Sequence, residues 1–360
     1  MKNRIRIKLT LEDGTIFLGW SFGAPVPAAG EVVFNTAMTG YPESLTDPSY
    51  KGQILCLTYP LVGNYGAPAL SEENHLYSFY ESSSIHISGL IVSDYSSDYS
   101  HWNANESLGD WLGRNNIPGV YGIDTRALTK RIREKGVMLG KLEPEGAVTD
   151  FYDPNKTNLV AGVSTREIKR YGTGKYRIML VDCGVKYNII RNLLKRDTTI
   201  IRVPWDYDYS KEEYDGLFLT NGPGDPKMCS ITIKHISYSF SDTKPIFGIC
   251  LGNQLMALAA GADTYKLKYG HRSHNQPVIK AGTEKAYITS QNHGYAVDNK
   301  TLPADWEPLF INLNDNTNEG MCHKTKPFFS TQFHPEASGG PTDTDFLFDE
   351  FIENIRLSMQ

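Results

Sequence analysis

The chain has 360 residues, a length that corresponds to two or three domains of ordinary size. It carries 36 Lys and Arg against 41 Asp and Glu, which gives a formal net charge of −5, and 40% of its residues are hydrophobic. This composition is that of a globular protein with a substantial core, and it offers no basic surface for nucleic acid or an anionic membrane. No stretch approaches the roughly 18 apolar residues of a transmembrane helix. The alternating N-terminus, Met1–Lys8, lacks the apolar core of a signal peptide and predicts a strand.

The first part of the chain is predicted to be rich in strands. Arg4–Leu11 and Thr15–Phe22 alternate and are separated by an acidic turn, which indicates a β-hairpin. One helix is predicted around Leu108–Leu112, and a second begins at Asp124 as its N-cap and ends at Gly136. We therefore expect a β-rich, mixed domain here.

The pattern weakens where prolines, glycines and charges accumulate, and this predicts a domain boundary. We expect a first domain over residues 1–150, a linker over 151–175 and a second domain over 176–360.

The second domain is predicted to be an α/β domain with a mainly parallel sheet flanked by helices. Short apolar runs alternate with segments of helical periodicity, as in proteins built from β-α-β units. Active sites in such sheets lie at the carboxyl ends of the strands, so the loops that follow Val181, Thr220 and Ile249 are the places to look for chemistry. The predicted strands are Ile178–Val181, Thr199–Val203, Leu217–Thr220 and Pro245–Ile249.

A candidate nucleophile lies in Gly248–Gly252, which has the form of a nucleophile elbow with Cys250 in place of serine. Asn253–Ala260 follows as a predicted helix, with Gly261 as its stop. The positive end of a helix dipole favours the thiolate form of a cysteine at its N-terminus. The backbone N–H of Leu251 would face a developing oxyanion. A structural cysteine in a strand that bends at glycine is the alternative.

Two further segments supply the partners that a cysteine nucleophile requires. The rigid loop Asn221–Pro226 follows a strand and offers further amides for an oxyanion, although an ordinary β-to-α turn has the same composition. After the predicted strand Phe328–Thr331, His334 and Glu336 stand two residues apart, as a general base and the carboxylate that orients it. The alternative for Glu336 is a solvated carboxylate in a loop.

A polar loop is predicted at Gln291–Val297, after the strand Ala286–Ser290, and it is suited to bind a small polar substrate. His293 is the weaker candidate base, because no carboxylate follows it two residues later; its default interpretation is a hydrogen-bonded loop histidine.

Other sites are not indicated by the sequence. There is no phosphate-binding loop and no dinucleotide fingerprint, and the five cysteines show no Cys-x-x-Cys spacing. The odd number of cysteines argues against a disulfide framework and favours a reducing cytoplasm. His271, His274 and His323 form no recognisable metal-binding pattern. The cysteines are Cys56, Cys183, Cys229, Cys250 and Cys322.

The elbow, the Asn221–Pro226 loop and the late His-Pro-Glu together resemble class I (triad) glutamine amidotransferases. Further motifs resemble the small subunit of carbamoyl-phosphate synthetases and extend the resemblance over nearly the whole chain, including an N-terminal domain that other amidotransferases of the class lack. These motifs are Asn35–Tyr41, Leu45–Tyr50, Gly122–Arg126 and Asp182–Ile189.

The resemblance implies a glutaminase that supplies ammonia through a tunnel to a large synthetase subunit, which the first domain would face. That partner would make carbamoyl phosphate from bicarbonate and ATP, for arginine and pyrimidine synthesis. No cofactor is expected in this chain; ATP and Mg²⁺ are expected on the large subunit. The implied partners are L-glutamine and that large subunit, with a heterodimer that can assemble further, and the implied location is cytoplasmic.

The resemblance also assigns roles to single residues. The nucleophile falls on Cys250, the base on His334 and the orienting carboxylate on Glu336. Two positions depart from the family pattern, Tyr295, where Phe is frequent, and Ser273, where Gly is frequent. The glutamine contacts carry over to Ser49, Gly222, Gly224, Leu251, Gln254, Asn292, Gly294 and Tyr295.

Three alternatives remain open from the sequence: a triad amidotransferase that serves another synthase, a catalytically inactive scaffold protein, and a cysteine hydrolase acting on peptides or esters. The first domain argues against the first and third, and the intact Cys250, His334 and Glu336 argue against the second.

Overall fold

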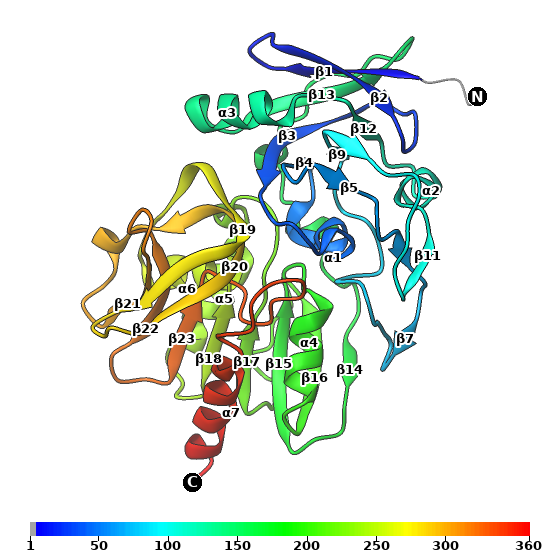
Figure 1. Cartoon of the computed structure of the whole chain (residues 1–360). Helices are drawn as coiled ribbons and strands as arrows, with labels where there is room; N and C mark the ends of the chain where they lie inside the picture. The colour runs from blue at the N-terminus through cyan, green and yellow to red at the C-terminus, as the bar shows by residue number, and fades with distance from the viewer. Residues whose placement is uncertain (1–4) are drawn as a thin grey trace. The chain divides into compact units, whose positions relative to one another are not determined.

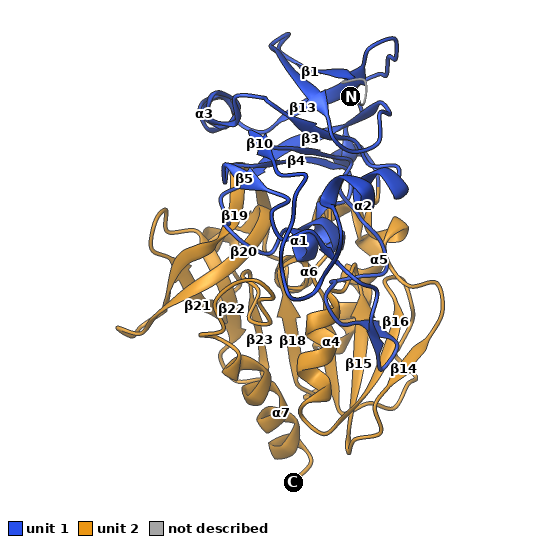
Figure 2. Ribbon diagram, turned by 45° about the vertical axis from the view of Figure 1, so that its right-hand side comes forward, with its two compact units in different colours: residues 1–157 blue, residues 158–360 orange. Residues whose placement is uncertain are grey.

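The structure is a computed structural model that describes residues 5–360. The chain forms two compact units, residues 1–157 and 158–360, coloured blue and orange in Figure 2. The predicted linker, 151–175, is divided between them, and its second part carries the 3₁₀ helix η3 (Val160–Gly162) and strand β14 (Lys169–Tyr171). The predicted first strand is observed from Arg6 onward; Met1–Arg4 lie outside the described residues.

The first unit is built on a closed β-barrel with the strand order β1-β13-β3-β4-β9-β12-β2. The predicted hairpin is confirmed, since β1 and β2 pair antiparallel with Thr10 opposite Ile16. The closure of the barrel was not predicted. Its strands are β1 (Arg6–Leu11), β2 (Ile16–Ser21), β3 (Ala28–Asn35), β4 (Gln53–Leu57), β9 (Gly89–Ile91), β12 (Gly119–Tyr121) and β13 (Met138–Pro144).

Helices and short strands complete this unit. The predicted helix after Asp124 is confirmed as α3 (Thr125–Lys135), because the Asp124 side chain accepts a hydrogen bond from the Ala127 N–H and Gly136 caps the end. The other predicted helix is α2 (Leu108–Arg114), whose Trp111 and Leu112 pack in one core with residues of β4 and β9. The remaining elements are α1 (Tyr41–Thr46), η1 (Pro48–Tyr50), η2 (Pro154–Lys156), β5 (Leu61–Val62), β6 (Ala67–Pro68), β7 (Glu72–Glu73), β8 (Leu76–Tyr77), β10 (Asp94–Tyr95) and β11 (Ala104–Glu106).

The second unit contains a ten-stranded sheet in the order β14-β16-β15-β17-β18-β23-β22-β21-β19-β20. Its parallel part consists of β16, β15, β17, β18 and β23, and the other strands pair antiparallel. The α/β prediction is confirmed, whereas "mainly parallel" is wrong, because half of the strands form an antiparallel extension. The strands are β14 (Lys169–Tyr171), β15 (Tyr176–Asp182), β16 (Thr198–Pro204), β17 (Gly216–Leu219), β18 (Ile246–Ile249), β19 (Thr264–Lys280), β20 (Ala286–Val297), β21 (Trp306–Asn312), β22 (Asn318–His323) and β23 (Phe328–Thr331).

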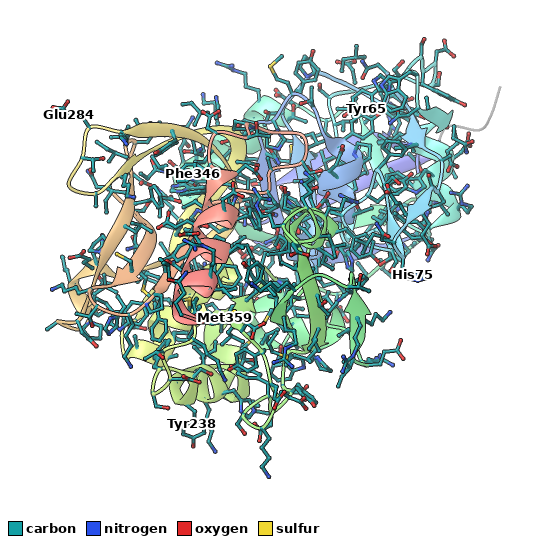
Figure 3. The ribbon with its side chains drawn as sticks, turned by 90° about the horizontal axis from the view of Figure 1, so that it is seen from below. Tyr65, His75, Tyr238, Glu284, Phe346 and Met359 are labelled. Atoms are coloured by element: carbon teal, nitrogen blue, oxygen red, sulfur yellow. The ribbon has the colours of Figure 1, made fainter. Side chains whose placement is uncertain are left out.

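Helices cover both faces of the parallel part, as its continuous apolar strands require. Leu219 packs with Leu255 of α6 on one face, whereas Phe218 contacts Phe351 of α7 on the other, with ring centroids 5.7 Å apart. Figure 1 shows α4 and α7 on the near side of the sheet, and Figure 3 labels Phe346 and Met359 at the two ends of α7. The helices are α4 (Tyr187–Leu194), α5 (Ser230–Ser239), α6 (Leu251–Ala260), α7 (Phe346–Ser358), η3 (Val160–Gly162), η4 (Pro226–Met228) and η5 (Asn299–Thr301).

No helix within residues 5–360 combines the length and the apolar character needed to cross a bilayer.

Candidate active site

Cys250 occupies a strained turn between β18 and α6, as the elbow motif predicts. Its backbone has φ 55° and ψ −100°, and it is the N-cap of α6. The strand and helix cross so closely that a Cβ added at Gly252 would overlap the carbonyl oxygen of Leu219, and one at Gly248 would lie 2.7 Å from Sδ of Met256. Glycine is therefore required on both sides of the cysteine, which is held in a conformation that L-residues rarely adopt.

His334 reaches the same edge of the sheet from the neighbouring strand. Because β18 and β23 are parallel with Ile249 opposite Thr331, the residues after each strand emerge side by side. The Cys250 N–H donates to the Thr331 carbonyl at 2.8 Å, and the His334 N–H donates to the Ser290 carbonyl at 2.9 Å. The two predicted catalytic groups are thus fixed by backbone hydrogen bonds on adjacent segments.

Glu336 holds the imidazole of His334 through a short contact. Nδ1 of His334 lies 2.7 Å from Oε1 of Glu336, and both side chains are buried. The carboxylate accepts from the Nδ1–H, which leaves Nε2 of His334 without a hydrogen-bond partner among the described residues and available to a reacting group. The structure therefore brings together the three side chains to which the sequence assigns catalytic roles.

Lys186 is a fourth buried side chain in this cluster, and no role for it was predicted. Its Nζ donates to Oε1 of Glu336 at 2.9 Å and to the carbonyl of Ala337 at 2.8 Å. Its position could have indicated a role, because Lys186 lies in the loop after Val181, at one of the strand ends where chemistry was expected.

The buried charges perturb one another. Burial opposes a charge on His334, but the Glu336 carboxylate and Cys250 outweigh burial and the nearby Lys186 and raise the pKa of His334 to about 10. Burial likewise opposes a charge on Glu336, yet Lys186 and His334 lower the pKa of that carboxylate to about 2. At neutral pH the pair is accordingly an imidazolium and a carboxylate.

The segment 292–295 lies beside the nucleophile, but as part of strand β20 rather than as the predicted loop. The Cys250 thiol lies 3.7 Å from the carbonyl oxygen of Asn292. Gln254, one turn into α6, donates from Nε2 to the carbonyl oxygen of Tyr295 at 2.9 Å. The loop prediction over Gln291–Val297 is wrong because these polar residues continue the ladder with β19, where His293 pairs with His271.

Gln254 is part of a buried amide network. Its Nε2 also donates to Oε1 of Gln332 at 3.1 Å, and Nδ2 of Asn253 donates to the same oxygen at 3.0 Å. Ser330 donates to Oδ1 of Asn253 at 2.7 Å. The network joins the start of α6 to the end of β23, and no local sequence pattern predicts it.

The loop after β17 closes on the elbow. A Cβ at Gly222 would overlap the carbonyl oxygen of Cys183 and would lie 2.7 Å from Cδ2 of Leu251. Gly224 has a φ of +86°, in the left-handed region that favours glycine. The three loops in which chemistry was expected thus meet.

The remaining predicted positions are placed as follows. Gly294 lies on β20, where a Cβ would come 3.3 Å from Nη2 of Arg272. Ser273 is buried on β19, accepts from Nε2 of Gln276 at 2.8 Å and has no positive φ, so serine fits where glycine is frequent. Ser49 belongs to the first unit, in η1, and its contact with glutamine stays a prediction.

One group of potential metal ligands occurs among residues 5–360, namely His271, His293 and Glu319, whose ligand atoms lie within 4.8 Å of one another. No metal pattern is apparent in the sequence, because these residues come from three strands.

Both halves of the chain match protein-family models. Residues 9–142 match the CPSase domain of the carbamoyl-phosphate synthase small chain, and residues 179–354 match the class-I glutamine amidotransferase model.

Known proteins align over almost all of the chain. The mitochondrial carbamoyl-phosphate synthase [ammonia] of Homo sapiens is 53% identical over 353 residues, which are 97% of this chain and 24% of that protein. The carbamoyl phosphate synthase arginine-specific small chain of Neosartorya fischeri is 49% identical over 362 residues, 98% of this chain and 80% of that one. Among solved structures, a putative GMP synthase protein from Thermoplasma acidophilum is 26% identical, with a TM-score of 0.45 over 52% of this chain and 98% of that one.

The chain spans about a quarter of the length of the first of these relatives but most of the length of the fungal small chain. Its two matched domains follow one another along the chain and together cover most of it. The chain therefore belongs to the family of carbamoyl-phosphate synthase small chains, with a class I glutamine amidotransferase domain as its second half.

Proposed function

We propose that this chain is the glutaminase subunit of a glutamine-hydrolysing carbamoyl-phosphate synthetase. The observation that carries the proposal is the cluster at the ends of β18 and β23, where Cys250 at a strained elbow faces a buried His334–Glu336 pair. Membership of the small-chain family supports the same conclusion.

The proposed reaction begins with the thiolate of Cys250 attacking the side-chain amide carbon of glutamine. The resulting oxyanion is held by the backbone N–H of Leu251 and an amide of the loop at Gly222–Gly224. The His334 imidazolium gives its proton to the amide nitrogen, so the C–N bond breaks and ammonia leaves. The raised pKa of His334, about 10, suits this step because the ring is protonated at neutral pH.

The second half regenerates the enzyme. Neutral His334 takes a proton from water, whose oxygen attacks the thioester carbon. The tetrahedral intermediate collapses to glutamate and the Cys250 thiolate, beside the imidazolium. Glu336 remains ionised throughout and fixes the ring orientation, as its low pKa of about 2 permits.

The glutamine contacts are proposed at Ser49, Gly222, Gly224, Leu251, Gln254, Asn292, Gly294 and Tyr295. Support comes from the second-unit members, which lie on the three converging segments around Cys250.

The proposed partner is a large synthetase subunit that carries the ATP and Mg²⁺ sites and consumes the ammonia. The sequence offers no phosphate-binding loop, which supports placing ATP on that partner. Because all five cysteines are free, we place the complex in a reducing compartment, the cytoplasm. Co-purification of an approximately 1:1 companion with ATP-binding domains would support the assignment; a companion without them would contradict it.

Replacing Cys250 by serine tests the catalytic proposal. The variant should lose glutamine hydrolysis by a factor of about 10³ or more, since a hydroxyl at this position lacks the thiolate nucleophile. Cys322→Ser is the matched control, because Cys322 lies on β22, outside the cluster. Ammonia release, measured on the chain with any partner that co-purifies with it, gives the readout. Retained turnover in Cys250→Ser would overturn the proposal.

A further inference from the structure

A buried cluster of charged and polar side chains lies behind the segment of β20 that borders Cys250. His271 on β19 stands opposite His293 on β20, with ring centroids 4.9 Å apart, and Glu319 on β22 reaches both rings. Oε1 of Glu319 lies 3.3 Å from Nδ1 of His271 and 3.8 Å from Nε2 of His293. All three residues are buried. The proposed reaction assigns them no role.

Each ring has a defined partner on its other nitrogen. Nε2 of His271 lies 2.8 Å from Oδ2 of Asp315, so both nitrogens of His271 face carboxylates. Nδ1 of His293 lies 2.8 Å from the carbonyl oxygen of Tyr295, which can only accept, so Nδ1 carries the proton. Glu319 consequently lies between His271, whose two carboxylate partners favour the imidazolium, and His293, whose tautomer is fixed by the carbonyl of Tyr295.

Burial raises the pKa of Glu319, and the hydrogen bond and charge of His271 oppose that rise. Burial disfavours a charge on His271, but Asp315 and Glu319 outweigh it and raise its pKa to about 9. Burial lowers the pKa of His293 well below its usual value, and the charge on His271 lowers it further. His271 is therefore the positive group of the cluster, and His293 is neutral.

The cluster is connected to the proposed glutamine site by hydrogen bonds. The Tyr295 carbonyl that accepts from His293 also accepts from Nε2 of Gln254, in the helix that begins after the nucleophile. On the other side, the backbone N–H of Gln332 donates to the Glu319 carbonyl at 2.8 Å. The cluster is thus linked to both segments that flank Cys250, on one side through His293 and on the other through the backbone of Glu319.

Packing alone does not explain a carboxylate at position 319, because burying an ionisable group costs free energy. Asn312 donates to Oε1 of Glu319 at 3.2 Å, but Oε2 has no hydrogen-bond partner and is inaccessible to solvent. Burying an ionisable group without full compensation is less favourable than burying an apolar side chain of the same size. This favours a role that depends on the charge and geometry of the group.

We propose that Glu319 is a positioning residue: it holds the ring of His271, which packs against the ring of His293, and so keeps the Asn292–Tyr295 backbone in the form that binds glutamine. The proposal rests on the proposed glutaminase function and extends it. Glu319 does not touch the substrate; its effect passes through the His293–Tyr295 hydrogen bond. Losing it allows that backbone to relax, which weakens glutamine binding more than it slows the chemistry at Cys250.

Glu319→Gln tests this proposal, because it preserves size and removes the charge. We expect the KM for glutamine to rise by about tenfold while kcat stays within about threefold, the signature of lost binding rather than lost chemistry. His271→Gln removes the positive charge that faces Glu319 and should likewise raise KM while leaving kcat nearly unchanged. The KM of the double variant should be no higher than that of either single variant. The matched control is Asp305→Asn, which breaks a His–carboxylate contact of 3.2 Å with His323 on the same sheet.

The outcomes are distinguishable. If Glu319→Gln fails to fold, His271→Gln supplies the test. An unchanged KM in a folded variant, or equal losses of kcat and thermal stability without a KM change, would overturn the positioning role. A glutamine KM that changes in the wild type on chelation with EDTA would also overturn it, because a metal ion would then hold the three side chains. Absence of glutamine hydrolysis in the wild type would instead count against the proposed function.

Discussion

Lys186 donates a hydrogen bond to the same carboxylate oxygen of Glu336 that contacts His334, at 2.9 Å from Nζ. The two cations therefore share one buried oxygen, and the lysine side chain is only 7% exposed. Lys186 lowers the pKa of both neighbours, so it keeps Glu336 ionised and moderates the basicity of His334.

Lys186→Met should destabilise the protein by about 3 kcal/mol, because it leaves a buried carboxylate without one of its two cations. Glutamine hydrolysis should fall as well, since Glu336 then orients His334 less firmly. Urea unfolding and ammonia release measure the two effects. Lys227→Met is the matched control: its ion pair with Asp263 joins half-exposed side chains, and breaking it should leave the free energy of unfolding nearly unchanged. Equal losses in both variants would contradict the structural account.

The His334–Glu336 pair should also set the pH dependence of the reaction. With a pKa of about 10, His334 loses its proton only in alkaline solution, so kcat/KM should decline as the pH rises through about 10. In Glu336→Gln the carboxylate that raises this pKa is gone while Lys186, which lowers it, remains. The alkaline decline should therefore move to lower pH by at least about one unit. A pH–rate profile with an unmoved alkaline limb would disprove the assignment.

The free energy of unfolding should depend on pH through the same two groups, His334 and Glu336. The folded pKa of His334 exceeds its usual value of 6.5, so its contribution is complete below pH 6.5 and is lost as the pH rises through about 10. The folded pKa of Glu336 lies below its usual 4.5, so its contribution is present above pH 4.5 and is lost as the pH falls toward about 2. The pair therefore contributes fully between pH 4.5 and 6.5, which urea unfolding at a series of pH values would measure.

Glycine at position 252 is required by the approach of two backbone segments. A Cβ there would overlap the carbonyl oxygen of Leu219, which belongs to a central strand and cannot move without disturbing the sheet. Gly252→Ala should therefore destabilise the protein by about 2–3 kcal/mol and reduce glutamine hydrolysis sharply. Gly113→Ala serves as control, because no atom lies within 4 Å of its added Cβ and helical alanine is favoured by about 0.5–1 kcal/mol. Thermal unfolding that ranks the two variants alike would refute this explanation.

The sequence was sufficient for the features that depend on local pattern. The elbow, the capped helix α3 and the parallel strands around Val181 could be predicted because each reflects a short-range rule of sterics or periodicity. The triad could be placed because adjacent parallel strands end at one edge.

The features that were missed depend on long-range pairing. The barrel closes through β1 and β13, with Leu11 opposite Gly140, a pairing that no local pattern announces. Lys186 and Glu336 are 150 residues apart in the chain. Gln291–Val297 was interpreted as a loop because its polar residues show no hydrophobic alternation, although a buried polar cluster on β19 and β22 accommodates them.

Selective alkylation offers a test that requires no substitution. Burial raises the pKa of the thiols of Cys56 and Cys229 to about 12, that of Cys183 well above its usual value, and that of Cys322 to about 11. At pH 7.5 the thiolate fraction of Cys322 is therefore about 1 in 3,000, too small for rapid reaction.

A glutamine-mimicking diazoketone should accordingly label Cys250 alone, because the reagent occupies the proposed substrate site beside the elbow. Peptide mapping by mass spectrometry identifies the labelled residue, and excess glutamine should protect it. Iodoacetamide, which resembles no amino acid, is the control for general thiol reactivity. Labelling at Cys322 in preference to Cys250, or labelling that glutamine does not slow, would be incompatible with a nucleophile at the end of β18. Such a result would leave the strained backbone at Cys250, with its φ of 55°, without a catalytic explanation.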